Sequence, residues 1–325
     1  MELNTIEKKL LYELDKNSRR SYNQIAKSIR KNKNTVRYNI DKLTKDGLIK
    51  KFFTIIDNYQ LGYTQHKVFI RLQNLTPVRK EDIIKHLTNH QNITWVAICD
   101  GQYDLIFSIR AKTLKHLKKI LMEFINLYGI NIKEKTITTI LEAEFFSRDY
   151  LLCNKRRDML SKVTLGTESG EINYDTIDLR ILAILSKNSR TPIVEIAKNL
   201  KLSVTTIIRR IKQLENRNII QKYSIILDNL RLNQFHFKVL IGLHNITEEK
   251  EKSLFNYLRQ LPNVFFIVNT LGMWEIEIDF EVKALHEFRT IMMELTNKFS
   301  DIIKDYSTLQ IYSIYKYEFF CEENI

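Results

Sequence analysis

The chain has 325 residues, of which 44% are hydrophobic and 27% charged, so we expect a folded protein of two or more domains rather than a disordered one. No apolar run reaches the roughly 18 residues that cross a bilayer, and three isolated cysteines favour a reducing compartment. We therefore expect a cytoplasmic protein without a membrane partner. The net charge of +13 is concentrated in residues 1–52 (+8) and 172–223 (+6), and such confined basic charge favours nucleic acid as a partner.

The sequence repeats itself at a constant offset of 171 residues. The shift places Asn17-Ser18-Arg19 on Asn188-Ser189-Arg190, and Gly101 on Gly272, without a gap. The polar stretch between the copies reads as a linker. We expect a first head at 1–60, a first sensor and pairing domain at 64–150, a linker at 151–172, a second head at 173–231 and a second sensor domain at 235–325.

Each copy opens with three helical patterns, which in the second copy span 174–186, 193–200 and 203–217. Asn32 and Ser203 are the expected N-caps of the third helices, and Gly47 and Asn218 are the expected stops. Extended segments follow at 50–56 and 221–227 and fit the wing of a winged helix-turn-helix.

The outward face of each third helix combines short polar groups with basic residues and carries almost no acid. Hydroxyl and amide groups at a helix N-terminus bind phosphate, and arginine can pair with guanine. The expected DNA contacts are Lys33, Asn34, Thr35, Arg37 and Tyr38 in the first copy, and Ser203, Thr205, Thr206, Arg209, Arg210 and Lys212 in the second.

The rest of each copy has the order β-α-β-β-α-β, which predicts a ferredoxin-like sandwich and an α+β fold class. Alternating strands are expected at 67–72 and 238–243, hairpins at 94–109 and 264–280, and last strands at 135–141 and 307–314. Apolar residues on both strand faces indicate that sheet packs on sheet between the two copies.

The string NSR…IAKNLKLSVTTIIRRIKQLENRNIIQKY…LD, followed by this sandwich with its G-x-[YW]-[DE] turn, resembles the Lrp/AsnC (feast/famine) transcription regulators in nearly the whole chain, twice. The resemblance implies a tandem duplication of a winged helix-turn-helix plus a ligand-sensing RAM domain. It also implies that an amino acid or similar small metabolite binds near the glycine turn. The implied effector residues are Gly101, Tyr103, Asp104, Gly272, Trp274 and Glu275, although the same residues also suit a tight hairpin that holds the fold together.

The two copies depart from each other at the third helix. The arginine of the family pattern is present as Arg210 but is replaced by Asn39 in the first copy. We therefore expect two unlike heads that read double-stranded DNA at an asymmetric site, with half-sites roughly 34 Å or a multiple apart. The chain is expected to form an intramolecular pseudo-dimer or a homo-oligomer.

Two other functions remain open. Relatives with this plan act as sirohaem decarboxylases, but the hairpins here contain no histidine and only Arg110 lies just beyond the first. An architectural DNA-binding protein without sequence preference is the other alternative.

His86 and His90 stand four residues apart on a helix, yet the metalloprotease glutamate is missing beside them. No catalytic residue, metal or cofactor is expected.

Overall fold

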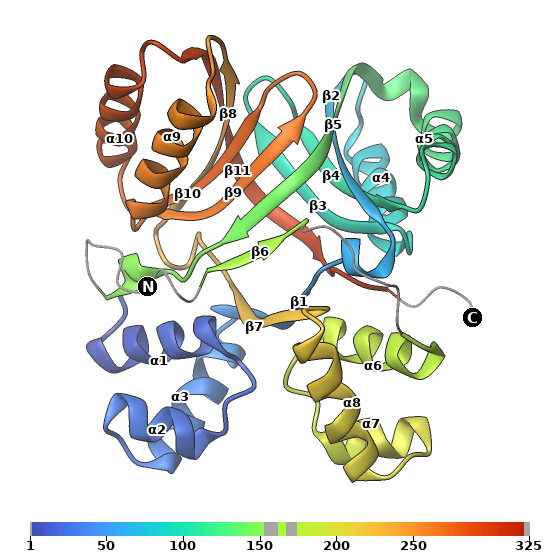
Figure 1. Cartoon of the computed structure of the whole chain (residues 1–325), viewed down its shortest axis with the longest axis vertical. Coiled ribbons are helices and arrows are strands. Elements are labelled where there is room, and N and C mark those ends of the chain that lie inside the picture. Colours follow the sequence, from blue (N-terminus) through green and yellow to red (C-terminus); the bar gives the residue numbers. More distant parts are fainter. Residues whose placement is uncertain (1, 153–161, 167–173, 322–325) are drawn as a thin grey trace.

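The computed structural model describes residues 2–152, 162–166 and 174–321, and it contains two similar α+β units (Figure 1). The heads are α1 (Thr5–Lys16), α2 (Tyr22–Ile29) and α3 (Lys33–Lys45), and α6 (Thr176–Lys187), α7 (Ile193–Leu200) and α8 (Val204–Asn216). The first sensor domain contains β2 (Thr64–Leu72), α4 (Pro77–Asn89), β3 (Ile93–Asp100), β4 (Leu105–Ala111), α5 (Leu114–Tyr128) and β5 (Ile132–Phe145). The second contains β8 (Phe235–Leu243), α9 (Glu248–Gln260), β9 (Val264–Leu271), β10 (Ile276–Val282), α10 (Leu285–Lys298) and β11 (Ile303–Tyr317).

The third helix of each head begins and ends at the predicted residues. The side chain of Asn32 accepts a hydrogen bond from the N–H of Thr35 at 2.7 Å, and that of Ser203 accepts one from Thr206 at 3.0 Å. Just after these helices, Gly47 has φ of 72° and Asn218 has φ of 55°, the left-handed conformation that glycine and asparagine tolerate.

The two sensor domains share one closed sheet. Within each domain the strand order is β5-β2-β4-β3 or β11-β8-β10-β9, the ferredoxin-like arrangement that the element order predicts. Each last strand also pairs with the other domain, β5 with β9 and β11 with β3, so eight antiparallel strands close into a barrel. The expected contact between sheets is present, but the sequence did not predict the shared edges. Closing the barrel pairs the strand edges that each sensor domain would otherwise expose to another chain.

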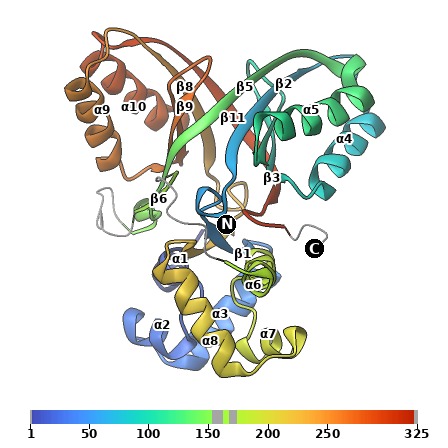
Figure 2. The same cartoon turned by 45° about the vertical axis from the view of Figure 1, so that its right-hand side comes forward.

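The barrel has helices on its outside and an aromatic core at its centre. Pairs α4–α5 and α9–α10 lie on opposite flanks (Figure 2). Inside, the rings of Phe69 and Trp274 meet edge to face with centroids 4.7 Å apart, and Tyr103 lies 5.4 Å from Phe69. Because these rings come from both sensor domains, their burial holds the two copies together.

The predicted wings have a different role. β1 (Ile49–Ile56) and β7 (Ile220–Leu227) do not fold into hairpins within their own heads; they pair with each other in an antiparallel ribbon, with Phe53 opposite Ser224. The ribbon lies between the barrel and the two heads (Figure 1). A segment that reads as a wing from one copy is therefore a joint between the copies.

The predicted linker contains one strand. Strand β6 (Val163–Leu165) pairs with Ala143–Phe145 of β5, while 153–161 and 167–173 lie outside the described residues. The domain boundaries given above stay a prediction. Within the described residues, no helix has the length and apolar character that a bilayer crossing requires.

Candidate nucleic-acid interface

The two third helices lie in heads at the same end of the molecule (Figure 1). Their inner stripes are buried: Val36, Ile40 and Leu43 in α3, and Ile207, Ile211 and Leu214 in α8. Most of the predicted contacts on the opposite faces are exposed, and three are half-buried. The exposed residues are Lys33, Asn34, Arg37, Tyr38, Ser203, Thr205, Arg209 and Lys212. The half-buried residues are Thr35, Thr206 and Arg210. The structure thus brings one set together on each head.

The two heads present different chemistry. The first has an open groove of about 720 Å³ along the α2–α3 turn, whose basic residues are Lys27, Arg30, Lys31 and Lys33. At the equivalent positions the second head has Lys198, Lys201, Leu202 and Val204. The first head therefore offers more charge to a phosphate backbone at this turn, which gives sequence-independent attraction.

Arg210 differs from the other predicted contacts because it is held at close range by two carboxylates of its own head. Its guanidinium lies 2.8 Å from both Asp175 and Asp178, and its side chain is 17% exposed. The hydrogen bond to Asp178 raises the pKa of Arg210. The counterpart Asn39 donates to the carbonyl of Thr35 at 2.8 Å instead. Arg210 thus braces α8 against the start of α6, and its DNA contact stays a prediction.

A symmetric clasp joins the heads, and it is built from the repeated Asn-Ser-Arg motif. The hydroxyls of Ser18 and Ser189 are 2.7 Å apart. Arg19 donates to the carbonyls of Ser189 and Thr191, and Arg190 donates to those of Ser18 and Arg20. This reciprocal pattern is that of a twofold interface. In the sequence, this motif served only as a sign of repetition. Its identity in the two copies was the signal that could have suggested a contact between them.

Removing both clasp arginines is expected to loosen the heads. We expect Arg19→Ala with Arg190→Ala to lower the free energy of unfolding by about 1–3 kcal/mol, because charge-assisted hydrogen bonds are removed. The same double variant should tolerate a wider range of half-site separations, measured by gel shift on duplexes with altered spacing. The control is Lys187→Ala, because Lys187 is an exposed basic residue of the second head, which also contains Arg190. An unchanged spacing preference in the double variant would contradict this role.

The predicted effector residues have structural roles at the barrel. The carboxylates of Asp104 and Glu275 accept hydrogen bonds from the N–H groups of Leu72 (2.6 Å) and Leu243 (2.7 Å). Tyr103 and Trp274 are 1% and 5% exposed.

The two glycine turns lie against the other sensor domain. Gly101 has φ of 130°, and a Cβ there would come within 2.8 Å of the carbonyl of Thr308 in β11. A Cβ at Gly272 would come within 2.9 Å of Thr138 in β5. The turns are therefore part of the contact between the copies, and effector binding at them stays a prediction.

The two histidines of α4 lie near each other and near one carboxylate. The rings of His86 and His90 have centroids 6.3 Å apart, and His90 lies 3.7 Å from Glu123. Within the described ranges, no group of three or more His, Cys, Asp or Glu side chains is arranged to hold a metal ion.

Comparison with known proteins agrees with this geometry. The winged helix-turn-helix DNA-binding family model matches residues 3–50 and 174–221, one match in each head. The HTH-type transcriptional regulator LysM of Saccharolobus solfataricus is 31% identical over 107 residues, 33% of this chain and 72% of that protein. The proline dehydrogenase transcriptional activator of Rhodobacter capsulatus is 31% identical over 121 residues, 37% of this chain and 79% of that protein.

The structural comparison extends over both copies. The siroheme decarboxylase NirDL has the same overall fold, with a TM-score of 0.61 and 12% identity over 97% of this chain and 94% of that one. Taken with the sequence matches, the fold and the paired heads define a DNA-binding transcription regulator. The chain belongs to the Lrp/AsnC family of these regulators, as a tandem duplication of its unit.

Proposed function

We propose that this regulator binds one asymmetric DNA site through two unlike heads held in a fixed pair by a single chain. The observation that carries the proposal is the clasp and ribbon between the heads, which leave α3 and α8 exposed at the same end of the molecule. Two identical heads related by a twofold axis would read a palindrome. Here the exposed side chains Lys33 and Tyr38 stand where the second head has Val204 and Arg209, so one base sequence cannot satisfy both.

Selection of bound duplexes from a random pool tests the proposal. The expected product is a site with two different half-sites roughly 34 Å or a multiple apart, bound about a thousandfold or more tightly than random duplex. A perfect palindrome would contradict the unlike heads. Equal affinity for all duplexes would support the architectural alternative instead.

Single arginine variants test which side chains of α8 reach the DNA. We expect Arg209→Ala to weaken binding and to reduce the slope of log affinity against log salt by up to about one unit for each phosphate that is no longer neutralised. Arg210→Ala should change that slope less, because its guanidinium is held by Asp175 and Asp178. Titrations at several salt concentrations measure both slopes. Equal changes of slope in the two variants would show that Arg210 leaves its partners on binding.

We also propose that a small metabolite such as an amino acid modulates the binding. Repeating the duplex selection with and without an amino-acid mixture tests this. A change in the selected site or its affinity is the expected result, and identical selections would remove the effector from the mechanism.

A second candidate function is an enzyme of the sirohaem decarboxylase class, favoured by the likeness of fold over the whole chain. The two hairpins lack histidine, and the exposed basic faces of α3 and α8 favour DNA. Addition of an iron porphyrin separates the two. We expect no shifted visible absorption band, and tight uptake with such a band would support the enzyme.

A further inference from the structure

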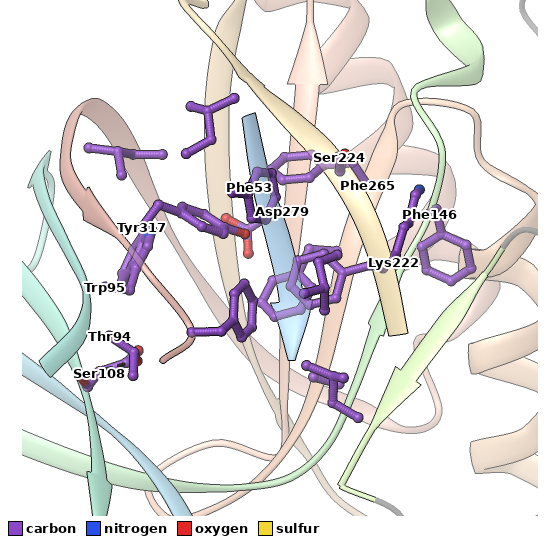
Figure 3. Close-up of a pocket in the computed structure, with 18 of the residues that line it drawn as sticks. Phe53, Thr94, Trp95, Ser108, Phe146, Lys222, Ser224, Phe265, Asp279 and Tyr317 are labelled. Carbon is purple, nitrogen blue, oxygen red and sulfur yellow. Dashed lines mark hydrogen bonds between the residues drawn. The ribbon is translucent and has the colours of Figure 1, made fainter. Parts of the chain in front are cut away.

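A cavity of about 90 Å³ lies where the ribbon meets the barrel interior. Both copies line it: Phe53 and Ser224 come from the ribbon strands, Thr94 and Ser108 from the first sensor domain, and Phe265 and Asp279 from the second. Figure 3 shows Asp279 near Phe53 and Tyr317, with Lys222 on the other side of the view. The space exceeds the volume that a single buried water needs.

Each carboxylate that lines this cavity already has a cationic partner. Asp279 accepts hydrogen bonds from His236 at 2.6 Å and from Lys238. Glu281 accepts from Arg148 at 2.8 Å, from Tyr150 and from Asn229 at 3.1 Å. Asp15 accepts from Arg148 at 2.6 Å and from Ser224 at 3.1 Å. Each of these carboxylates is therefore already paired with a cationic side chain.

The lysines that line the cavity have donors to spare. Lys222 is buried, and its ammonium reaches only the hydroxyl of Ser147 at 3.5 Å and a carboxylate oxygen of Asp15 at 3.9 Å within the described residues. An ammonium group carries three N–H donors. Burial lowers the pKa of Lys222, and it lowers that of Lys67, on the barrel side, to about 8. Lys67 and Lys238 pair with Glu277 behind the cavity wall, whereas the nearest carboxylate to Lys222 lies 3.9 Å away.

The rest of the wall is aromatic. Phe53, Trp95, Phe265 and Tyr317 surround the space. Aromatic walls with a few placed polar groups are typical of small-molecule sites.

We propose that this cavity binds one small organic carboxylate with an apolar body. The carboxylate accepts hydrogen bonds from Lys222, and the apolar body packs against the aromatic side chains that line the cavity, where Phe53 and Tyr317 touch edge to face. The site differs in place from the glycine turns and in chemistry from an amino-acid site, because the carboxylates that line it are already paired with cationic side chains and an added ammonium group would compete with them. It does not depend on DNA binding.

The site occurs once per chain because the repeat breaks its own symmetry here. Asp279 and Glu281 of β10 correspond to Ser108 and Arg110 of β4. Lys222 corresponds to Lys51, which is bound to Glu318 at 2.6 Å and does not line the cavity. We therefore expect a stoichiometry of one ligand per chain.

Calorimetric titration of the full chain, without DNA, tests the proposal with acetate and propionate as probes, because a space of about 90 Å³ corresponds to about three waters at roughly 30 Å³ each. We expect one of these carboxylates to bind at one per chain, and its neutral amide analogue to bind at least tenfold more weakly. Ethylamine, which is of similar size but carries a cation, should not bind. If neither carboxylate binds, or if the amide binds equally well, the proposal is overturned.

Three variants locate the binding. Lys222→Met should weaken the carboxylate at least tenfold, which is about 1.4 kcal/mol, while Lys51→Met, the matched lysine of the other copy, should leave it unchanged. Should Lys222→Met fail to fold, Ser108→Val tests the same site. The larger side chain fills part of the cavity, so we expect it to weaken binding of the carboxylate. Equal binding by wild type and Ser108→Val would place the ligand elsewhere and overturn the site. Because the readout is heat of binding, its failure leaves the DNA proposal intact.

Discussion

Replacing Arg148 with methionine is expected to lower the free energy of unfolding by about 3–5 kcal/mol, the cost of leaving buried charges without their partner. Arg148 follows β5 and binds Asp15 of α1 at 2.6 Å and Glu281 of β10 at 2.8 Å. Burial alone would lower the pKa of Arg148, but Glu281 and Asp15 outweigh it and raise the pKa. One side chain thus connects the first head to the second sensor domain. Urea unfolding followed by circular dichroism measures the loss of stability.

Arg37→Met is the control for this change, because Arg37 is 68% exposed and its ion pair with Asp41 at 3.8 Å should contribute less than about 1 kcal/mol. The pH dependence gives a second check. Burial alone would raise the pKa of Asp15, but Lys222 and Arg148 lower it. Asp15 therefore stabilises the fold above its ordinary pKa of about 3.9 and loses this contribution as the pH falls. In Arg148→Met the acid loss should be shallower, and identical acid curves would argue against the ion pair.

The local features of the fold were predictable because they depend on neighbours in the sequence. Caps at Asn32 and Ser203, the stop at Asn218 and the order β-α-β-β-α-β all follow from short-range chemistry. The joint between the copies was not predictable in this way. The segment 50–56 reads equally well as a wing or as a strand paired with 221–227, because strand pattern does not specify the partner.

The buried charges of β10 were missed for a related reason. Alternation in 274–280 predicts a strand with an acidic face, but not what covers that face. In a closed barrel both faces are covered, by helices outside and by the other strands inside. Glu277 and Asp279 are consequently 0% and 2% exposed, and their partners are Lys67 of the first copy and Lys238 of the second. Alternation shows that the two faces of a strand differ in polarity. It does not show that either face is exposed to solvent.

Replacing Trp274 with alanine is expected to have an effect of similar size, about 3–5 kcal/mol, because a large buried aromatic leaves a cavity. Trp274 is 5% exposed and packs edge to face on Phe69 of the other copy. We therefore expect the substitution to lower the free energy of unfolding by more than it lowers the free energy of binding any effector. Chemical unfolding with the near-ultraviolet signal of Trp95 as a tertiary probe measures it.

The matched control is Tyr103→Phe, which keeps the ring in the same aromatic cluster and removes only the hydroxyl contact to Thr136 at 2.8 Å. Removing one such hydrogen bond should cost about 0.5–1.5 kcal/mol. The comparison also decides what the turn residues do. If Trp274→Ala stays as stable as wild type but no longer responds to an amino acid, the turn is a sensor contact. If the stability and the pairing of the two sensor domains fall together, the aromatic residue of the G-x-[YW]-[DE] turn serves first to join the two copies. Any effector would then contact a side chain that is already held in the aromatic core.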